Sequence, residues 1–134
     1  MIGIIICGHG NFASGLNSSV KLLAGEVTDL TFVDFLAGMG QDELKEKIEE
    51  EINSLNHCSK VIILTDIVGG TPFKTSVIVS MEKKNILVIS GTNLPLLLQL
   101  VISKDLSDDV DSLISNSIKE SQEAMFLFEL ENFE

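Results

Sequence analysis

The chain has 134 residues, of which 45% are hydrophobic and 22% are charged, so it can bury one substantial core and is too apolar for a disordered tail. Its formal net charge is −11, and all 9 basic residues are lysine. This balance disfavours direct binding to nucleic acid or to an anionic membrane, and it favours a basic protein partner.

The first predicted strand is the apolar run from Ile2 to Cys7, which is short, rich in β-branched residues and free of polar alternation. A helix should follow, because apolar residues recur at helical spacing from Phe12 to Leu23, with Gly25 as the stop signal. The tripeptide Gly8-His9-Gly10 lies between these two elements, which places the histidine in a strand-to-helix turn. Ligands bind beyond the carboxyl ends of the strands in open α/β sheets, so this turn is a candidate site.

The rest of the chain alternates between strand and helix patterns in the same way. Strands are expected at residues 30–35, 61–65 and 86–90, and helices at residues 44–55, from 71, from 94, and from 108 to 124. In the second of these helices Thr71 should be the cap, and Pro72 should occupy the first turn. Repeated βα units predict one doubly wound α/β domain over residues 1–134, with a mainly parallel sheet and helices on both faces.

The segment from Met125 to Leu130 has no obvious place in such a domain. Its hydrophobic side chains outnumber the polar ones on either a strand or a helix period. It could be an edge strand of its own sheet, or it could cross to a second subunit, since exchange of a terminal element is an easy route to a dimer. Exposed phenylalanines here would invite aggregation, so we expect a homodimer with an exchanged C-terminal edge strand.

Several features indicate a cytoplasmic protein. The N-terminus has neither the basic region nor the cleavage site of a signal peptide, and the apolar stretch from Leu94 to Ile102 is too short to span a bilayer. Cys7 and Cys58 do not make a disulfide framework, and we expect both to be buried, reduced thiols. His57 precedes the third strand and should lie on the surface, at the opposite end of the sheet from His9.

Asp66 ends the third predicted strand and should lie beside His9. The first and third strands of a doubly wound sheet are usually neighbours, so their carboxyl ends meet. A carboxylate there would accept one imidazole N–H and select the tautomer, which leaves the other ring nitrogen free as a nucleophile. Each residue alone also fits a structural role, as a turn histidine or a capping aspartate, and it is their combination that indicates chemistry.

Glycine-rich turns near these two residues predict a site for a phosphoryl group. The sequence Gly69-Gly70-Thr71 leads into a helix N-terminus, where backbone N–H groups can bind an anionic oxygen. We therefore expect Gly70, Thr71 and Gly10 to bind phosphate, with His9 as the nucleophile. The pattern contains no evident metal cage and requires no cofactor. Without arginine in the chain, any guanidinium clamp on the phosphate must come from a partner.

In these residues the chain resembles the IIA domain of the mannose-family sugar phosphotransferase system. The resemblance rests on Gly8-His9-Gly10, on Asp66 to Phe73 and on Asn93-Leu94-Pro95, and it covers essentially the whole chain in order. It implies that His9 takes phosphate from the phosphocarrier protein HPr. His9 would then pass the phosphate to a histidine of a IIB protein, which phosphorylates sugar during import through the IIC and IID membrane subunits.

The resemblance also assigns roles to individual residues. It implies that Asp66 orients His9, that Gly70 and Thr71 contact the phosphate, and that two copies exchange their C-terminal strands. Lys74 departs from the family pattern, which often has asparagine after Pro-Phe, and we expect its side chain to point to solvent. The family leaves the sugar open, although the chain looks nearer to the amino-sugar branch than to the mannose branch. Because the chain ends without a IIB domain, the acceptor is expected to be a separate polypeptide.

Other functions stay open on the residues alone. The phosphotransferase subunit of dihydroxyacetone kinase has a similar domain, and there the phosphate ends on the nucleotide of a kinase subunit. A receiver-like regulatory module would need an acidic cluster with a metal at the strand ends, where the first strand of this chain delivers a histidine. A small hydrolase would need a nucleophile elbow of the Gly-x-Ser-x-Gly type, which the glycine turns lack.

Overall fold

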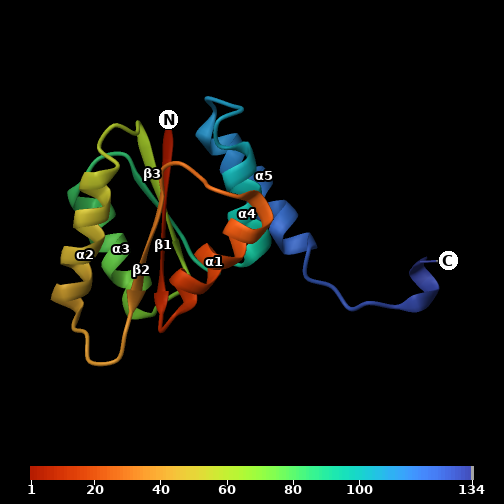
Figure 1. Cartoon of the computed structure of the whole chain (residues 1–134), viewed down its shortest axis with the longest axis horizontal. Coiled ribbons are helices and arrows are strands. Elements are labelled where there is room, and N and C mark those ends of the chain that lie inside the picture. The colour runs from red at the N-terminus through yellow and green to blue at the C-terminus, as the bar shows by residue number, and fades with distance from the viewer. Residues whose placement is uncertain (134) are drawn as a thin grey trace.

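A computed structural model describes residues 1–133 and shows a parallel sheet of four strands in the order β2-β1-β3-β4, with helices on both faces (Figure 1). The doubly wound α/β prediction is confirmed. The elements in chain order are β1 Ile2–His9, α1 Phe12–Ala24, β2 Leu30–Phe35, α2 Gln41–Ser54, β3 Lys60–Thr65, α3 Thr71–Glu82, β4 Ile86–Ile89, α4 Leu94–Ser103, α5 Val110–Glu123 and a 3-10 helix Leu130–Phe133.

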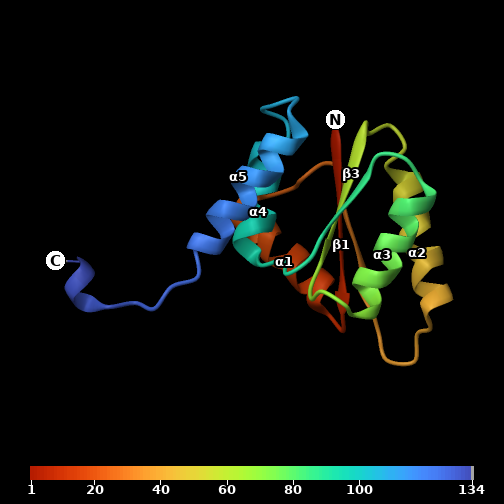
Figure 2. The same ribbon diagram turned by 180° about the vertical axis from the view of Figure 1, so that it is seen from behind.

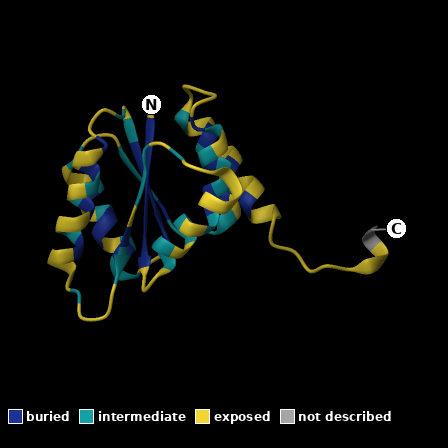
Figure 3. Cartoon of the chain, viewed as in Figure 1, coloured by how far each residue is buried: buried dark blue, intermediate teal, exposed yellow. Residues whose placement is uncertain are grey.

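The central strand β1 divides the core into two layers. One layer holds Ile4 and Ile6 under α1, α4 and α5, and the other holds Ile5 and Cys7 under α2 and α3. Figure 2 shows the two helix groups from behind, and Figure 3 shows the sheet as the most buried part of the chain. Because both faces of β1 are covered from Ile2 to Cys7, this part of the strand is continuously apolar rather than alternating, which makes it recognisable in the sequence.

The strand β1 is longer than its apolar run. It continues through Gly8 and His9, which pair with Asp34 and Phe35 of β2, so the histidine ends the strand rather than lying in the turn that we predicted. A side chain at position 8 would collide with Phe12, because a Cβ atom there would lie 2.5 Å from the phenylalanine ring. The glycine therefore lets the first helix fold back closely over the end of β1.

The helix boundaries agree with most of the sequence signals. Gly25 ends α1 with a φ of 74°, and Asp109 caps α5 by accepting a hydrogen bond from the Ser112 N–H, so this helix begins two residues later than predicted. The prediction that Thr71 caps α3 is wrong, because Gly70 is the extended N-cap residue and Thr71 is already helical. Among residues 1–133, no helix is both long and apolar enough to cross a bilayer.

The C-terminal segment leaves the domain after α5. Residues 125–129 form no strand, and the chain extends away from the sheet before the short 3-10 helix (Figures 1 and 2). The alternative that these residues cover the edge of their own sheet is therefore wrong for the described part of the chain. Met125, Phe126 and Leu127 are 81%, 67% and 79% exposed, so the segment has apolar side chains without cover from its own domain.

The layer beneath α4 gives a direct test of the packing. Leu97 is fully buried against the sheet, so Leu97→Ala should lower the free energy of unfolding by about 2–5 kcal/mol in urea titrations. Ile102 lies on the same helix but is 57% exposed, and Ile102→Ala should cost no more than about 0.5 kcal/mol. Equal losses for the two variants would contradict this assignment of the core.

Candidate functional site

His9 and Asp66 meet at the carboxyl end of the sheet, as the sequence predicts. The same carboxylate oxygen, Oδ2 of Asp66, accepts the backbone N–H of His9 at 2.8 Å and lies 2.7 Å from the ring Nδ1. The side chain of His9 is 44% exposed, whereas that of Asp66 is 11% exposed. The carboxylate is thus a buried support, and the imidazole is the group that another molecule can reach.

This contact selects the form of the imidazole. An ionised carboxylate only accepts hydrogen bonds, so the geometry assigns a proton to Nδ1 and leaves the lone pair of Nε2 unprotonated in the neutral ring. Burial alone would raise the pKa of Asp66, but hydrogen bonds from the His9 N–H, the His9 ring and the Ile67 N–H hold this pKa below its usual value. Asp66 is therefore a stable carboxylate at neutral pH.

Two neighbours hold the ring in place. Phe35, at the end of β2, packs edge-on against the imidazole, with ring centroids 5.8 Å apart and an interplanar angle of 75°. On another side, a Cβ atom at Gly70 would lie 2.7 Å from Cε1 of His9 and 3.4 Å from Nε2. The glycine therefore lets the backbone approach the nucleophilic side of the ring, which a larger residue would displace.

The beginning of α3 lies beside this ring. Gly70 is its N-cap residue, and the cap makes no side-chain hydrogen bond. Within residues 1–133, no partner is recorded for the N–H groups of Thr71 and Phe73 in the first turn, and Pro72 has none to satisfy. These donors and the positive end of the helix dipole are able to bind an anion beside the His9 ring.

The beginning of α1 contributes less than predicted. Gly10 has a φ of 57°, and its N–H already donates to the Phe35 carbonyl at 2.8 Å, so this donor is occupied in the free protein. The first turn of α1 is capped by Asp34, whose Oδ1 accepts the Ser14 N–H at 2.9 Å. Sequence reasoning missed this role of Asp34, although its place at the end of a predicted strand was the available signal.

Cys7 lies beneath the site and takes no part in its chemistry. Burial, together with the negative charges of Asp66 and Asp34, raises the pKa of its thiol to about 12. Cys7 is therefore a neutral core side chain, as predicted. Cys58 is also a free thiol, but it is only partly buried, which corrects the expectation of full burial.

The rim of the site is open and partly apolar. Ile67 and Val68, in the turn between β3 and α3, are 58% and 71% exposed, and Leu36, just after β2, is 49% exposed. Lys74 is exposed on α3, in agreement with the expectation that it points to solvent. Large exposed apolar side chains around a reactive group are typical of a surface that docks against another protein.

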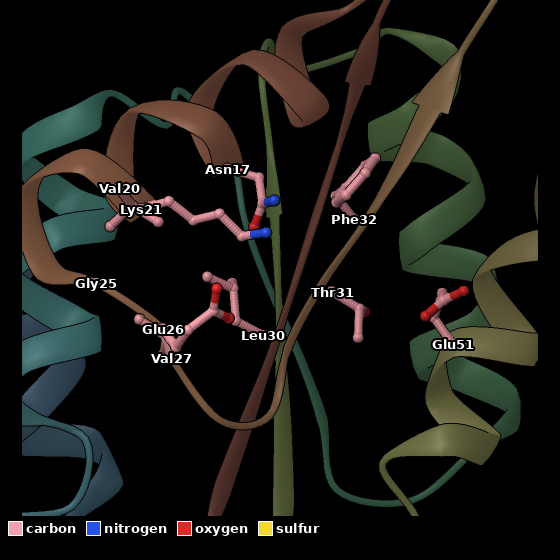
Figure 4. Close-up of a pocket in the computed structure, with 10 residues that line it drawn as sticks. All are labelled: Asn17, Val20, Lys21, Gly25, Glu26, Val27, Leu30, Thr31, Phe32 and Glu51. Atoms are coloured by element: carbon pink, nitrogen blue, oxygen red, sulfur yellow. The ribbon is translucent and has the colours of Figure 1, made fainter.

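A cavity of about 390 Å³ lies elsewhere, along the outer side of β2 (Figure 4). Thr31 of β2, Lys21 of α1 and Glu51 of α2 are among its lining residues, whereas His9 and Asp66 are not. The His9–Asp66 contact therefore lies on an exposed rim and not inside this cavity.

Comparison with known proteins identifies the family. The family model described as PTS system fructose IIA component matches residues 3–118. The chain belongs to this family. It is 35% identical over 101 residues to the fructose-specific EIIA component of Bacillus subtilis (strain 168), which covers 75% of the chain and 69% of that protein.

Two further comparisons show how much of each chain the similarity covers. The chain is 28% identical over 124 residues to the mannose-specific EIIAB component of Escherichia coli (strain K12), covering 92% of the chain but spanning only 38% of that longer protein. A crystal structure of a phosphotransferase system component EIIA from Streptococcus agalactiae superposes with a TM-score of 0.88 at 36% identity. This superposition covers 96% of the chain and 98% of the Streptococcus chain, so the IIA fold accounts for nearly all of both.

The depressed pKa of Asp66 makes a testable contribution to stability. An aspartate whose pKa lies below its usual 3.8 in the folded state stabilises the fold above that value, and this stabilisation is lost as the pH falls through the folded pKa. The difference in unfolding free energy between the unmodified chain and Asp66→Asn should therefore shrink between about pH 5 and about pH 2. Urea titrations across this range measure it, and a constant difference would contradict the assignment.

Proposed function

We propose that this IIA protein is a cytoplasmic phosphoryl carrier that accepts phosphate from phospho-HPr on His9 and passes it to a separate IIB protein. The single observation that carries the proposal is the contact between Nδ1 of His9 and Oδ2 of Asp66 at 2.7 Å, which leaves Nε2 free beside the start of α3. The phosphate would then reach sugar during uptake through IIC and IID membrane subunits, with which the protein would associate at the membrane surface.

In the first transfer, Nε2 of His9 attacks the phosphorus in line. The new bond joins phosphorus to Nε2, while the bond from phosphorus to the HPr histidine breaks and leaves its electron pair on that nitrogen. The His9 ring keeps its Nδ1 proton and becomes positively charged. Asp66, which is already ionised and hydrogen bonded, stabilises this charge without moving. Transfer to the IIB histidine reverses these steps.

The phosphoryl oxygens require hydrogen-bond donors, and Gly70 and Thr71 are the residues proposed to bind them. Support comes from the N–H groups at the start of α3 and from the close approach of Gly70 to the ring. Gly10 is the third proposed phosphate-binding residue, and its N–H, which donates to the Phe35 carbonyl in the free protein, would exchange that partner for a phosphoryl oxygen. Phosphoryl transfer of this kind needs positioning and charge stabilisation, and no cofactor enters the proposal.

The partner surfaces should supply the missing positive charge. The chain has a formal net charge of −11 and no arginine, so a dianionic phosphoryl group at His9 has few cations of its own protein nearby. Guanidinium or ammonium groups on HPr and IIB would complete the site and steer these partners to it. The exposed Ile67, Val68 and Leu36 would pack against the partner around the reacting atoms.

The competing functions find less support. A receiver-like module needs free acidic groups at the strand ends, but Asp66 is bonded to His9 and Asp34 is bonded to the Ser14 N–H. The dihydroxyacetone kinase alternative differs only in the acceptor, so transfer assays against a IIB protein and against that kinase subunit separate the two. Curated relatives are named for mannose, fructose and sorbose, and the preference for an amino sugar stays a prediction.

Labelling experiments test the proposed nucleophile. With phosphoenolpyruvate and the general phosphotransferase proteins, the unmodified chain should become phosphorylated, and His9→Ala should abolish the labelling. Asp66→Ala should slow the transfer by about 100-fold, because the ring loses its orientation and the tautomer is no longer selected. Circular dichroism should show that both variants keep the fold.

His57→Gln is the matched control, since it removes the other histidine. This variant should be labelled at the unmodified rate. Labelling of His9→Ala at another residue would refute the role of His9, and an unchanged rate in Asp66→Ala would remove the orienting role of the carboxylate.

We also propose that two copies exchange their C-terminal segments. The edge strand β4 and helix α5 border a groove of about 570 Å³ lined by Leu87, Ile89, Ile114 and Ile118 among others. The exposed segment from Met125 to Leu127 has the apolar character and extended form to add to such an edge. Because the segment leaves its own domain, the groove of a second copy is the proposed receptor.

A charge within this segment should prevent the exchange. The unmodified chain should have the mass of a dimer by light scattering after size exclusion, and Phe126→Asp should have the mass of a monomer. Leu106→Asp, at an exposed position in the loop between α4 and α5, should leave the dimer intact. A monomeric unmodified chain at micromolar concentration, or a dimeric Phe126→Asp variant, would count against exchange.

A further inference from the structure

We propose that Asp29, His57 and Cys58 form a zinc-binding site at the end of the sheet opposite to His9. Each of these residues offers one ligand atom, and the carboxylate oxygen, the imidazole nitrogen and the sulfur all lie within 4.8 Å of one another. Zinc accepts this mixture of oxygen, nitrogen and sulfur ligands in tetrahedral geometry. Three protein ligands leave the fourth position of the zinc ion to a water molecule. This site does not depend on phosphoryl transfer at His9.

The ligand atoms are already close to the required spacing. Nε2 of His57 lies 2.7 Å from Oδ1 of Asp29, where the two share a hydrogen bond. A tetrahedral zinc ion with bonds of about 2.0–2.3 Å holds its ligand atoms roughly 3–4 Å apart. The nitrogen and oxygen would therefore separate by about 0.3–1.3 Å to admit the ion.

The backbone fixes the two loops that carry these ligands. Asp29 has a φ of 61°, and its carbonyl accepts the Ile4 N–H of β1 at 2.9 Å. The turn that contains His57 and Cys58 is tied to the same strand, because the Ser59 N–H donates to the Met1 carbonyl at 2.8 Å. Both loops are thus attached to the start of β1, so the three side chains converge on a rigid frame.

The position of Cys58 distinguishes this cluster from a simple histidine–aspartate pair. A Cβ atom at Gly3 would lie 2.9 Å from Cδ1 of Leu55 and 3.2 Å from Sγ of Cys58, so both side chains pack over the β1 backbone where a glycine leaves room. The cluster therefore offers a sulfur atom beside the oxygen and the nitrogen, which makes three ligand atoms rather than two.

The cluster is also accessible to a metal ion. The side chain of His57 is 46% exposed and that of Asp29 is 15% exposed, so one side of the cluster faces solvent. Burial and the Asp29 carboxylate raise the pKa of the Cys58 thiol above its usual value, so a bound metal ion must displace the thiol proton. On binding, the sulfur releases its proton to solvent, and the His57 ring gives up its Nε2 proton while Nδ1 takes one up, so that the neutral ring binds zinc through the Nε2 lone pair with no change of oxidation state.

Cobalt(II) is the probe, because it occupies zinc sites and reports its ligands by absorption. The metal-free, reduced, full-length chain should bind one cobalt ion and give a sulfur-to-cobalt charge-transfer band together with the strong visible bands of tetrahedral cobalt. Added zinc should abolish both sets of bands. Cys58→Ser should remove the charge-transfer band, and His57→Gln and Asp29→Asn should each weaken binding by about tenfold or more.

Matched controls remove the other candidate ligands. Cys7→Ala and His9→Gln should keep the cobalt spectrum and affinity of the unmodified chain. Circular dichroism tests whether each variant folds. If Cys58→Ser does not fold, the cobalt affinities of His57→Gln and Asp29→Asn decide whether the metal binds at this cluster.

Phosphoryl labelling of His9 in the three ligand variants should be unchanged, so failure of the zinc site and failure of the proposed phosphoryl transfer can be distinguished. No charge-transfer band in the unmodified chain, or a band that survives in folded Cys58→Ser, would overturn the zinc site.

Discussion

Parallel pairing of β1 with β3 is the constraint on which the site depends. The register places Cys7 opposite Thr65, so the residues that follow them, including His9 and Asp66, emerge at the same edge of the sheet. One oxygen of Asp66 then accepts both the backbone N–H and the ring of His9. The imidazole is thereby tied to the main chain of its own strand and to the end of its neighbour. Such a double attachment orients the imidazole without requiring a deep cavity.

The open form of the site fits exchange between proteins better than binding of a small molecule. A pocket for a small substrate encloses most of its ligand, whereas His9 stands 44% exposed on a rim with apolar residues around it. The chain provides an exposed imidazole, a fixed carboxylate and backbone donors, but no arginine. In the proposed transfer, this surface would supply one half of a reaction site, and the docking partner would supply the positive charge of the other half.

The two ends of the sheet carry the same pair of side chains in different surroundings. His9 contacts Asp66 beside the start of α3, where backbone N–H groups favour an anion. His57 contacts Asp29 at the other end, where the third neighbour is the sulfur of Cys58. The third group is the basis on which the two proposals differ, because a helix N-terminus can bind a phosphoryl group and a cysteine sulfur can bind a metal cation. A histidine–aspartate contact alone would not distinguish the two ends.

The sequence by itself determined the sheet, the order of its elements and the His9–Asp66 contact, because buried parallel strands are continuous apolar runs and their carboxyl ends converge. Only the tertiary structure decided the finer assignments. It moved the α3 cap from Thr71 to Gly70 and showed that the Gly10 N–H is already bonded to Phe35. It also brought Asp29 together with the adjacent residues His57 and Cys58, although His57 lies 28 positions further along the chain. These features depend on distances between loops, and a pattern of residue types along the chain carries no such distances.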